Sequence, residues 1–214
     1  MRLYSNIKME SELKNSMKTG TTILGIVCKD GVVMAADRRG TAGGMILSKN
    51  IKKVFTINDY IVMSGCGSGM EIVKIPRYVA AELKLKELKS KTRPSVKQAA
   101  NLLSNIRISG QSAFLLAGFN EDGTTELYTT DPSGYVEKVE DYDASYGSGM
   151  PFVLGFLERQ YKKGISVEEG VKLAVESLKS STQRDEASGN GIDVFTITKD
   201  GIKQVVDMEI RPNY

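Results

Sequence analysis

The residues best suited to chemistry stand near the start of the chain, where a polar leader ends in Gly20-Thr21-Thr22. The 214 residues include no histidine, which is the usual base beside a hydroxyl nucleophile. A threonine that becomes the first residue of a mature chain supplies its own base, because a free α-amine has a pKa of about 7.7–8.0. The sequence therefore predicts a protease or amidase that must cut itself between Gly20 and Thr21.

Two charged residues at predicted strand ends are candidates to assist Thr21. Asp37 ends the second predicted strand, and Lys53 begins the third. Antiparallel pairing could bring both near the start of the first strand. There the lysine ammonium would lower the pKa of the Thr21 hydroxyl, and the aspartate would hold the lysine in place. Taken alone, the same pattern also fits ordinary surface residues.

A second polar group lies near the end of the chain, in Arg184-Asp185-Glu186-Ala187-Ser188-Gly189. Asp185 and Ser188 are three residues apart in a turn that ends at glycine, so they can direct polar groups to one point. A capped helix end is the alternative interpretation. Gly65 is a candidate backbone donor to an oxyanion, and a tight strand-to-helix turn would explain it as well.

Turn signals and hydrophobic periods predict the elements that must position these residues. Strands are expected over 22–28, 32–36, 53–57, 60–64, 112–118, 126–130, 135–139, 193–198 and 202–206. Helices are expected from the glycine-dense segment 65–69 to about residue 90, from Ser95, over 151–162, and from Ser166. Residues 41–45 are small and glycine-rich and are expected to form a loop. Grouped rather than alternating elements predict an α+β domain of antiparallel sheets covered by helices.

Composition narrows the class of protein. Hydrophobic content of 41% and charged content of 26% are ordinary for a globular protein, and a net charge of +3 gives no reason to expect a nucleic-acid partner. No apolar run approaches the about 20 residues that span a bilayer, and the charged leader does not read as a secretory signal. Cys28 and Cys66 are expected to be buried free thiols, which fits the cytoplasm. Two cysteines without histidine argue against a zinc site.

The chain resembles the archaeal kind of proteasome β-type subunit, within the N-terminal nucleophile hydrolases, from Gly20 to about Ile210. The motifs that carry the resemblance are Gly20-Thr21-Thr22, Gly25, the run from Gly31 to Arg39, Lys52-Lys53, Tyr146-Gly147-Ser148-Gly149, Arg184-Asp185, Ser188-Gly189 and Asp193-Val194. The resemblance implies a four-layer α/β/β/α sandwich of two antiparallel sheets between helix layers. It also implies a propeptide over residues 1–20 that is removed on maturation, followed by a single catalytic domain over 21–214.

By resemblance, Thr21 is the nucleophile and its amine the base, while Asp37 and Lys53 match the acid and lysine of the family. Three further residues match the cluster that orders the amine and a nearby water; these are Ser148, Asp185 and Ser188. Gly65 best matches the oxyanion-hole glycine, with Gly67 as its rival because the stretch 63–71 looks about two residues short. The stretch 107–114 also looks shortened, which could alter contacts between subunits.

The resemblance also implies a substrate pocket and partners. The pocket would be lined by Gly40, Thr41, Ile51, Met63 and Gly67, none of them charged, so cleavage after large apolar side chains is expected. Partners would be other β-type and α-type subunits in stacked seven-membered rings, a regulatory ATPase on the α rings, and unfolded protein as substrate. We expect neither a metal nor an organic cofactor, and neither nucleic acid nor membrane as a partner. The alternatives are a catalytically silent β-type subunit and a stand-alone N-terminal nucleophile amidase.

Overall fold

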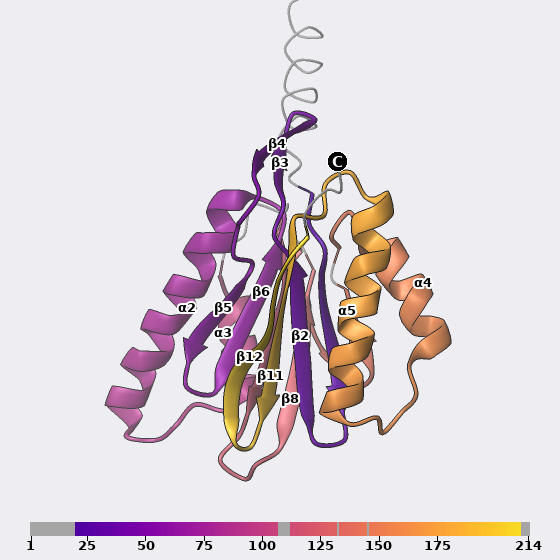
Figure 1. The fold of residues 1–214 in the computed structure, drawn as a ribbon. Coiled ribbons are helices and arrows are strands. Elements are labelled where there is room, and N and C mark those ends of the chain that lie inside the picture. The colour runs from indigo at the N-terminus through magenta and orange to yellow at the C-terminus, as the bar shows by residue number, and fades with distance from the viewer. Residues whose placement is uncertain (1–19, 107–111, 132, 145, 211–214) are drawn as a thin grey trace, which may run out of the picture.

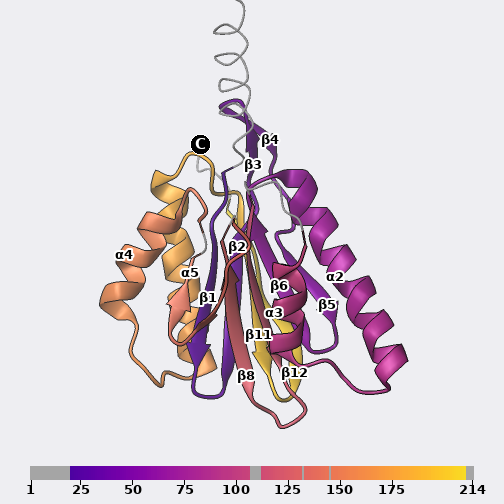
Figure 2. The ribbon, with the colours of Figure 1, turned by 180° about the vertical axis from the view of Figure 1, so that it is seen from behind.

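The protein is a sandwich of two β-sheets with a layer of helices on each outer side, as Figures 1 and 2 show from opposite directions. A computed structural model describes residues 20–106, 112–131, 133–144 and 146–210. The leader before Gly20 and most of the shortened stretch 107–114 lie outside these residues. The layer order agrees with the predicted α+β fold of antiparallel sheets between helix layers, so this prediction is confirmed.

The first sheet has the strand order β10-β1-β2-β11-β12. It contains β1 (Ile23–Cys28), β2 (Gly31–Asp37), β10 (Tyr142–Asp143), β11 (Gly191–Thr198) and β12 (Gly201–Glu209). All its pairings are antiparallel, and β2 lies in the middle between β1 and β11. The register pairs Ala36 with both Ile23 and Asp193, so the end of β2 lies beside the start of β1 and the start of β11.

The second sheet has the order β5-β6-β7-β8-β9 and is also antiparallel throughout. Its strands are β5 (Val54–Asn58), β6 (Ile61–Cys66), β7 (Ala113–Phe119), β8 (Thr125–Thr130) and β9 (Val136–Val139). Asn58 makes the turn between β5 and β6, because its side-chain oxygen accepts hydrogen bonds from the backbone N–H groups of Tyr60 and Ile61. The predicted hairpin is therefore present.

In the described part of the chain, four helices cover the sheets, and the signals at their starts are those expected. Helices α2 (Gly69–Ser90) and α3 (Val96–Ser104) cover the second sheet, while α4 (Met150–Gln160) and α5 (Val167–Arg184) cover the first. Ser95 and Ser166 both form complete capping boxes, with Gln98 and Glu169 respectively. Helix α2 carries Pro76 within it. No helix among the described residues is long and apolar enough to cross a membrane.

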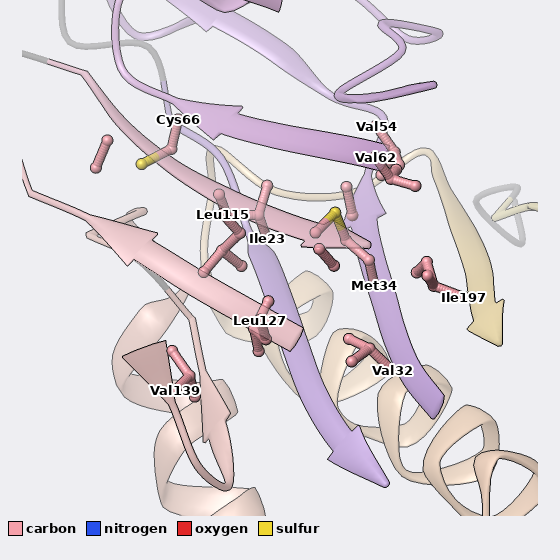
Figure 3. Packing of buried hydrophobic residues seen from close by; sticks show 13 residues of the cluster. Ile23, Val32, Met34, Val54, Val62, Cys66, Leu115, Leu127, Val139 and Ile197 are labelled. Atoms are coloured by element: carbon pink, nitrogen blue, oxygen red, sulfur yellow. The ribbon is translucent and has the colours of Figure 1, made fainter. Parts of the chain in front are cut away.

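The core has three parts, one between the sheets and one beneath each helix layer. Figure 3 shows the part between the sheets, where Ile23, Val32 and Met34 face Leu115 and Leu127. The alternate residues of β1 and β2 face α4 and α5 instead, so both faces of this hairpin are buried. Cys28 and Cys66 are buried thiols outside any disulfide, as predicted.

Three strands differ from the sequence prediction, namely β3 (Gly40–Ala42), β4 (Met45–Ser48) and β10. Residues 41–45 are not a loop, because β3 and β4 form an antiparallel hairpin that projects from one end of the molecule. Gly43 and Gly44 make its turn, with φ values of +58° and +75°. Two successive positive φ values are what a tight two-residue hairpin turn requires, so the glycines that suggested a loop are the turn itself. The short strand β10 was not predicted.

Candidate active site

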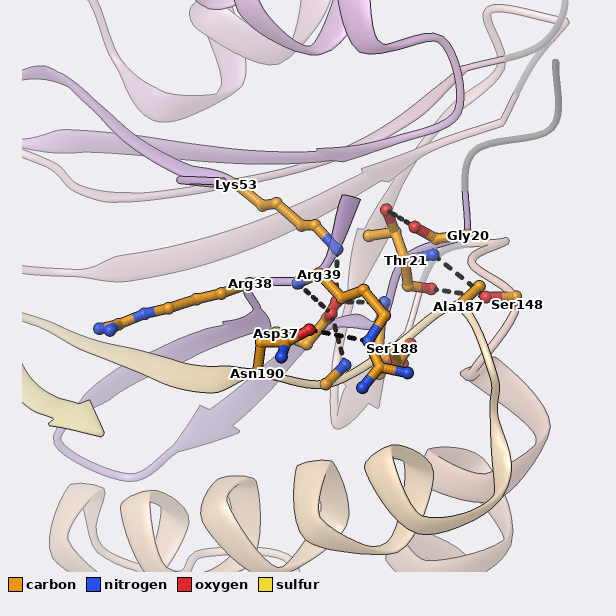
Figure 4. Close-up of polar contacts among 12 residues, drawn as sticks. Gly20, Thr21, Asp37, Arg38, Arg39, Lys53, Ser148, Ala187, Ser188 and Asn190 are labelled. Atoms are coloured by element: carbon orange, nitrogen blue, oxygen red, sulfur yellow. Dashed lines mark hydrogen bonds and ion pairs between the residues drawn. The ribbon is translucent and has the colours of Figure 1, made fainter. Parts of the chain in front are cut away.

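Asp37, the last residue of β2, joins four segments of the chain and is fully buried. Its Oδ1 accepts hydrogen bonds from the Thr22 backbone nitrogen at 2.8 Å and from Lys53 Nζ at 2.6 Å. Its Oδ2 accepts from the backbone nitrogens of Arg39 and Gly189, both at 2.9 Å. The carboxylate therefore ties the start of β1, the residue before β5 and the approach to β11 to the end of β2 (Figure 4).

Lys53 precedes β5 and is only 2% exposed, which is unusual for a lysine. Its ammonium pairs with Asp37, and the Lys53 backbone carbonyl accepts a hydrogen bond from Ser64 on β6 at 2.8 Å. Burial lowers the pKa of Lys53 below its ordinary value, while the neighbouring Asp37 carboxylate opposes that shift. A buried lysine whose pKa is lowered can exchange a proton with a nearby hydroxyl more readily than a surface lysine can.

Thr21 lies buried between Gly20 and β1, with 1% of its surface exposed. In the uncut chain its hydroxyl donates a hydrogen bond to the carbonyl oxygen of Gly20 at 2.7 Å. The Gly20 nitrogen donates to the Thr41 hydroxyl of β3 at 3.1 Å, so the residue before the predicted cut is held on both sides. The hydroxyl oxygen of Thr21 is thus next to the peptide group that the sequence predicts it to attack.

A chain of hydroxyl and carboxylate groups reaches the Thr21 nitrogen from the other side. That nitrogen donates to Ser148 Oγ at 3.1 Å, and Ser148 donates to Asp185 Oδ2 at 2.6 Å. Ser188 Oγ donates to the same Asp185 oxygen at 2.5 Å and contacts the Thr22 hydroxyl at 2.6 Å. Ser148, Asp185 and Ser188 are therefore brought together at Thr21 from widely separated parts of the sequence.

Close backbone approaches explain several glycines around this point. A Cβ on Gly20 would lie 1.7 Å from the Cβ of Ala187, and a Cβ on Gly147 would lie 2.3 Å from the Thr21 carbonyl oxygen. Only glycine fits at either position without displacing the neighbouring segment. The site is therefore built by close contact between 20–22, 147–149 and 185–189.

The two candidate oxyanion glycines have different surroundings. Gly65 lies inside β6, in register with Phe114, and a Cβ there would lie 2.7 Å from the Phe114 ring. Gly67 follows Cys66, the last residue of β6 in register with β7, and has a φ of +112°. Such a φ strongly favours glycine, so Gly67 is needed where the chain turns from β6 into α2.

The predicted pocket residues are only partly brought together. Ile51 packs on Gly40, since its Cδ1 would lie 2.1 Å from a Cβ there, and neighbouring Thr41 binds Gly20. Met63 does not join them. It is fully buried in the cluster beneath α2 and α3, so it offers no surface to a substrate.

Two residues without a predicted role, Thr22 and Arg39, also contribute. Thr22 links Asp37 to Ser188 through its nitrogen and its hydroxyl. Arg39 donates to Asn190 Oδ1 at 2.9 Å and to the Glu186 carbonyl at 2.7 Å. Thr22 directly follows Thr21, and Arg39 comes two residues after Asp37, so proximity in the sequence was the available signal. Among the described residues no group of three or more acidic, cysteine or histidine side chains is placed to hold a metal ion.

Comparison with known proteins identifies the family. A model of the family described as "Proteasome subunit" matches residues 17–197. The chain is 43% identical over 197 residues to "Proteasome subunit beta 1" of Thermococcus kodakarensis, covering 90% of this chain and 95% of that one. It is 44% identical over 196 residues to "Proteasome subunit beta 1" of Thermococcus onnurineus, covering 89% and 95%. Identity to "Proteasome subunit beta" of Methanopyrus kandleri is 38% over 204 residues, covering 92% and 96%. The chain therefore belongs to the proteasome subunit family, and the three relatives above, which it matches along nearly its whole length, are named as β subunits.

Proposed function

We propose that this chain is a catalytic β-type subunit of a proteasome core and that Thr21 is its nucleophile. The observation that carries the proposal is the position of the Thr21 hydroxyl, 2.7 Å from the Gly20 carbonyl oxygen and one residue from the buried Asp37–Lys53 pair. A silent subunit would have no use for a buried lysine and aspartate beside the threonine, since burying two charges is costly.

Maturation is the first reaction of this proposal. The Thr21 oxygen attacks the Gly20 carbonyl carbon, and the bond from that carbon to the Thr21 nitrogen breaks as the hydroxyl proton passes to the nitrogen. Water then hydrolyses the resulting ester, which releases residues 1–20 and leaves Thr21 with a free amine. Ser148 Oγ, which accepts from that nitrogen at 3.1 Å, would then orient the new amine.

Peptide hydrolysis follows the same path with a substrate carbonyl in place of Gly20. The neutral Thr21 amine takes the hydroxyl proton, while the Lys53 ammonium lowers the pKa of that hydroxyl and Asp37 fixes Lys53 in position. Asp185 and Ser188 orient Ser148 toward the amine. A backbone N–H stabilises the oxyanion, and we favour Gly67 over Gly65 because its φ of +112° marks the turn from β6 into α2, whereas Gly65 lies inside the strand. The acyl group on Thr21 is finally transferred to water.

The proposed setting follows from the family. Proteasome subunits assemble with one another, and we propose stacked seven-membered rings with β-type subunits inside and α-type subunits outside. A regulatory ATPase would dock on the α rings, and the substrates would be unfolded proteins in the cytoplasm. The two buried thiols, neither of them in a disulfide, are compatible with that reducing compartment.

The decisive experiment is the mass of the mature chain, measured for wild type, Thr21→Ala and Thr21→Ser. Each variant is assembled without any other active subunit, so that no neighbour can trim it. Wild type and Thr21→Ser should begin at residue 21, because both carry a hydroxyl at the attacking position. Thr21→Ala should keep its leader and hydrolyse no peptide. Trimming of Thr21→Ala at the Gly20–Thr21 bond would refute self-cleavage.

A further inference from the structure

The segment between α5 and β11, residues 185–190, supplies Asp185 and Ser188 to the candidate site but has no regular secondary structure. Here it is called the 185–190 loop. Asp185 and Ser188 must be held in place, because a displacement of about 1 Å in a catalytic arrangement can cost on the order of 100-fold in rate. The question is which contacts hold the loop.

Arg39 makes side-chain contacts at both ends of this loop. Its Nη1 donates to the Glu186 carbonyl at 2.7 Å, and its Nε donates to Asn190 Oδ1 at 2.9 Å. The loop also lies directly against the guanidinium, since a Cβ on Gly189 would be 2.5 Å from Arg39 Nη2. Asn190 has a φ of +64°, a conformation that asparagine tolerates better than most residues, and this turn directs its side chain to Arg39. Figure 4 shows the guanidinium among these loop residues.

The backbone of Arg39 is fixed by the same carboxylate that fixes the loop. Asp37 Oδ2 accepts from the nitrogens of both Arg39 and Gly189 at 2.9 Å, and the Arg38 nitrogen donates to the Gly189 carbonyl at 3.1 Å. Asp37 thus holds the backbone of Arg39 next to that of Gly189. The planar guanidinium of Arg39 then fixes the path of the loop between Glu186 and Asn190. Among the described residues Arg39 forms no ion pair with a carboxylate. Its guanidinium donates instead to the Glu186 carbonyl oxygen and the Asn190 amide oxygen.

We infer that Arg39 is a positioning residue for the reaction at Thr21. It fixes the 185–190 loop so that Asp185 holds Ser148 against the Thr21 nitrogen, and so that Ala187 closes against Gly20. This inference rests on the proposed function, because it concerns the arrangement of groups that function uses. Lysine cannot replace Arg39, since a single ammonium cannot reproduce the planar fork that reaches both loop ends.

The test compares Arg39→Lys and Asn190→Gly with Arg38→Lys in the assembled, matured particle. Asn190→Gly accommodates the positive φ and removes the side chain whose oxygen accepts from Arg39. Arg38→Lys is the matched control, because the Arg38 guanidinium binds Asp193 and Asp207 rather than the loop. Three quantities are measured: kcat and KM on a fluorogenic peptide, the pH dependence of kcat/KM, and hydrogen exchange of peptides covering 185–190.

We expect Arg39→Lys to lower kcat on the order of 10-fold with KM changed less than about twofold. The acidic limb of the pH profile should move to lower pH, because a displaced Asp185 no longer favours the protonated Thr21 amine. Hydrogen exchange across the 185–190 loop should be faster in Arg39→Lys than in wild type. Asn190→Gly should change each of these quantities in the same direction. Arg38→Lys should keep the wild-type acidic limb of the pH profile and the wild-type exchange of the loop.

Wild-type kcat, pH profile and loop exchange in Arg39→Lys would overturn the inference. A fall in kcat with an unchanged limb and unchanged exchange would overturn it too, because the defect would then lie elsewhere. Failure of the proposed function is recognised separately, as absence of peptide cleavage in the wild-type particle. Loop exchange still decides the placement of the loop by Arg39 in that case.

Discussion

Lys53 is far more deeply buried than a lysine usually is. A lysine that is 2% exposed beside a fully buried aspartate is costly unless its neighbours use it. The carboxylate is well satisfied, with Lys53 and three backbone nitrogens as donors. The pair therefore presents an ammonium whose position is fixed and whose pKa is lowered by burial, next to the Thr21–Thr22 peptide.

We predict that Lys53→Ala and Lys53→Arg both lose peptidase activity, by on the order of 10²–10³-fold in kcat. The alanine variant removes the charge, and arginine is too large and too basic to share a proton with the Thr21 hydroxyl. Lys52→Ala is the control, because Lys52 is adjacent but exposed and should keep wild-type turnover. Fluorogenic peptide assays on the assembled particle decide the matter, and near-normal turnover by Lys53→Arg would contradict the proposed role.

Asp185 should leave a signature in the pH profile. Through Ser148 its carboxylate faces the Thr21 nitrogen, and a nearby negative charge raises the pKa of an amine. Asp185→Asn should therefore lower the pKa of the mature Thr21 amine and shift the acidic limb of kcat/KM to lower pH. At the same time kcat should fall because the amine is less well oriented. If the acidic limb of kcat/KM does not move in Asp185→Asn, the Asp185 carboxylate has no effect on the pKa of the Thr21 amine.

At the scale of elements, local signals predicted most of the fold. The Ser95 and Ser166 capping boxes and the Asn58 turn lie where the sequence placed them. One failure was local, because Gly43 and Gly44 suggested a loop and instead form the turn of the β3–β4 hairpin. The other depended on a contact distant in sequence, because β10 is two residues long and pairs with β1. The predicted strand ends were enough to indicate that Asp37, Lys53 and Thr21 are neighbours. The contacts of Arg39 with the 185–190 loop could not be predicted, because they join segments about 150 residues apart in the sequence.

The turn that leads into α4 is predicted to be intolerant of any side chain. A Cβ on Gly149 would lie 1.8 Å from the Thr22 hydroxyl, which binds Ser188. Gly149→Ala should therefore displace Thr22 and impair both self-cleavage and peptide hydrolysis. Gly155→Ala, within α4, meets nothing within 4 Å and should mature normally. Intact mass and peptide turnover measure both effects, and normal maturation of Gly149→Ala would show that Thr22 can move without cost.

The pocket for the side chain before the cut is expected to favour large apolar groups. Its residues near Gly20 are Gly40, Thr41 and Ile51, which offer no carboxylate to a basic side chain. Peptides that differ only at this residue should be cut faster after leucine, tyrosine or phenylalanine than after arginine or glutamate. Faster cleavage after a charged residue by a particle in which this chain is the only active subunit would show that other residues form the pocket.

For the whole molecule, the outer face of α2 carries apolar side chains that remain exposed in the single chain. Tyr78, Leu85 and Leu88 are 47%, 44% and 66% exposed, and their spacing of seven and three residues places them along one side of the helix. Such a stripe is costly in water unless another surface covers it. In a family whose members assemble, we expect a neighbouring subunit of the particle to do so.

Replacing Leu85 and Leu88 together by glutamate should therefore reduce assembly while leaving the sandwich folded, because both side chains point away from the core. Native mass spectrometry of the chain expressed with its partner subunits measures the assembled fraction, and circular dichroism checks the fold. Lys86→Glu, which adds a negative charge on the same exposed turn, is the control and should assemble. Full assembly of the double variant would show that this face of α2 lies outside the contacts. A wild-type chain that stays monomeric and still cuts itself would instead favour a stand-alone amidase.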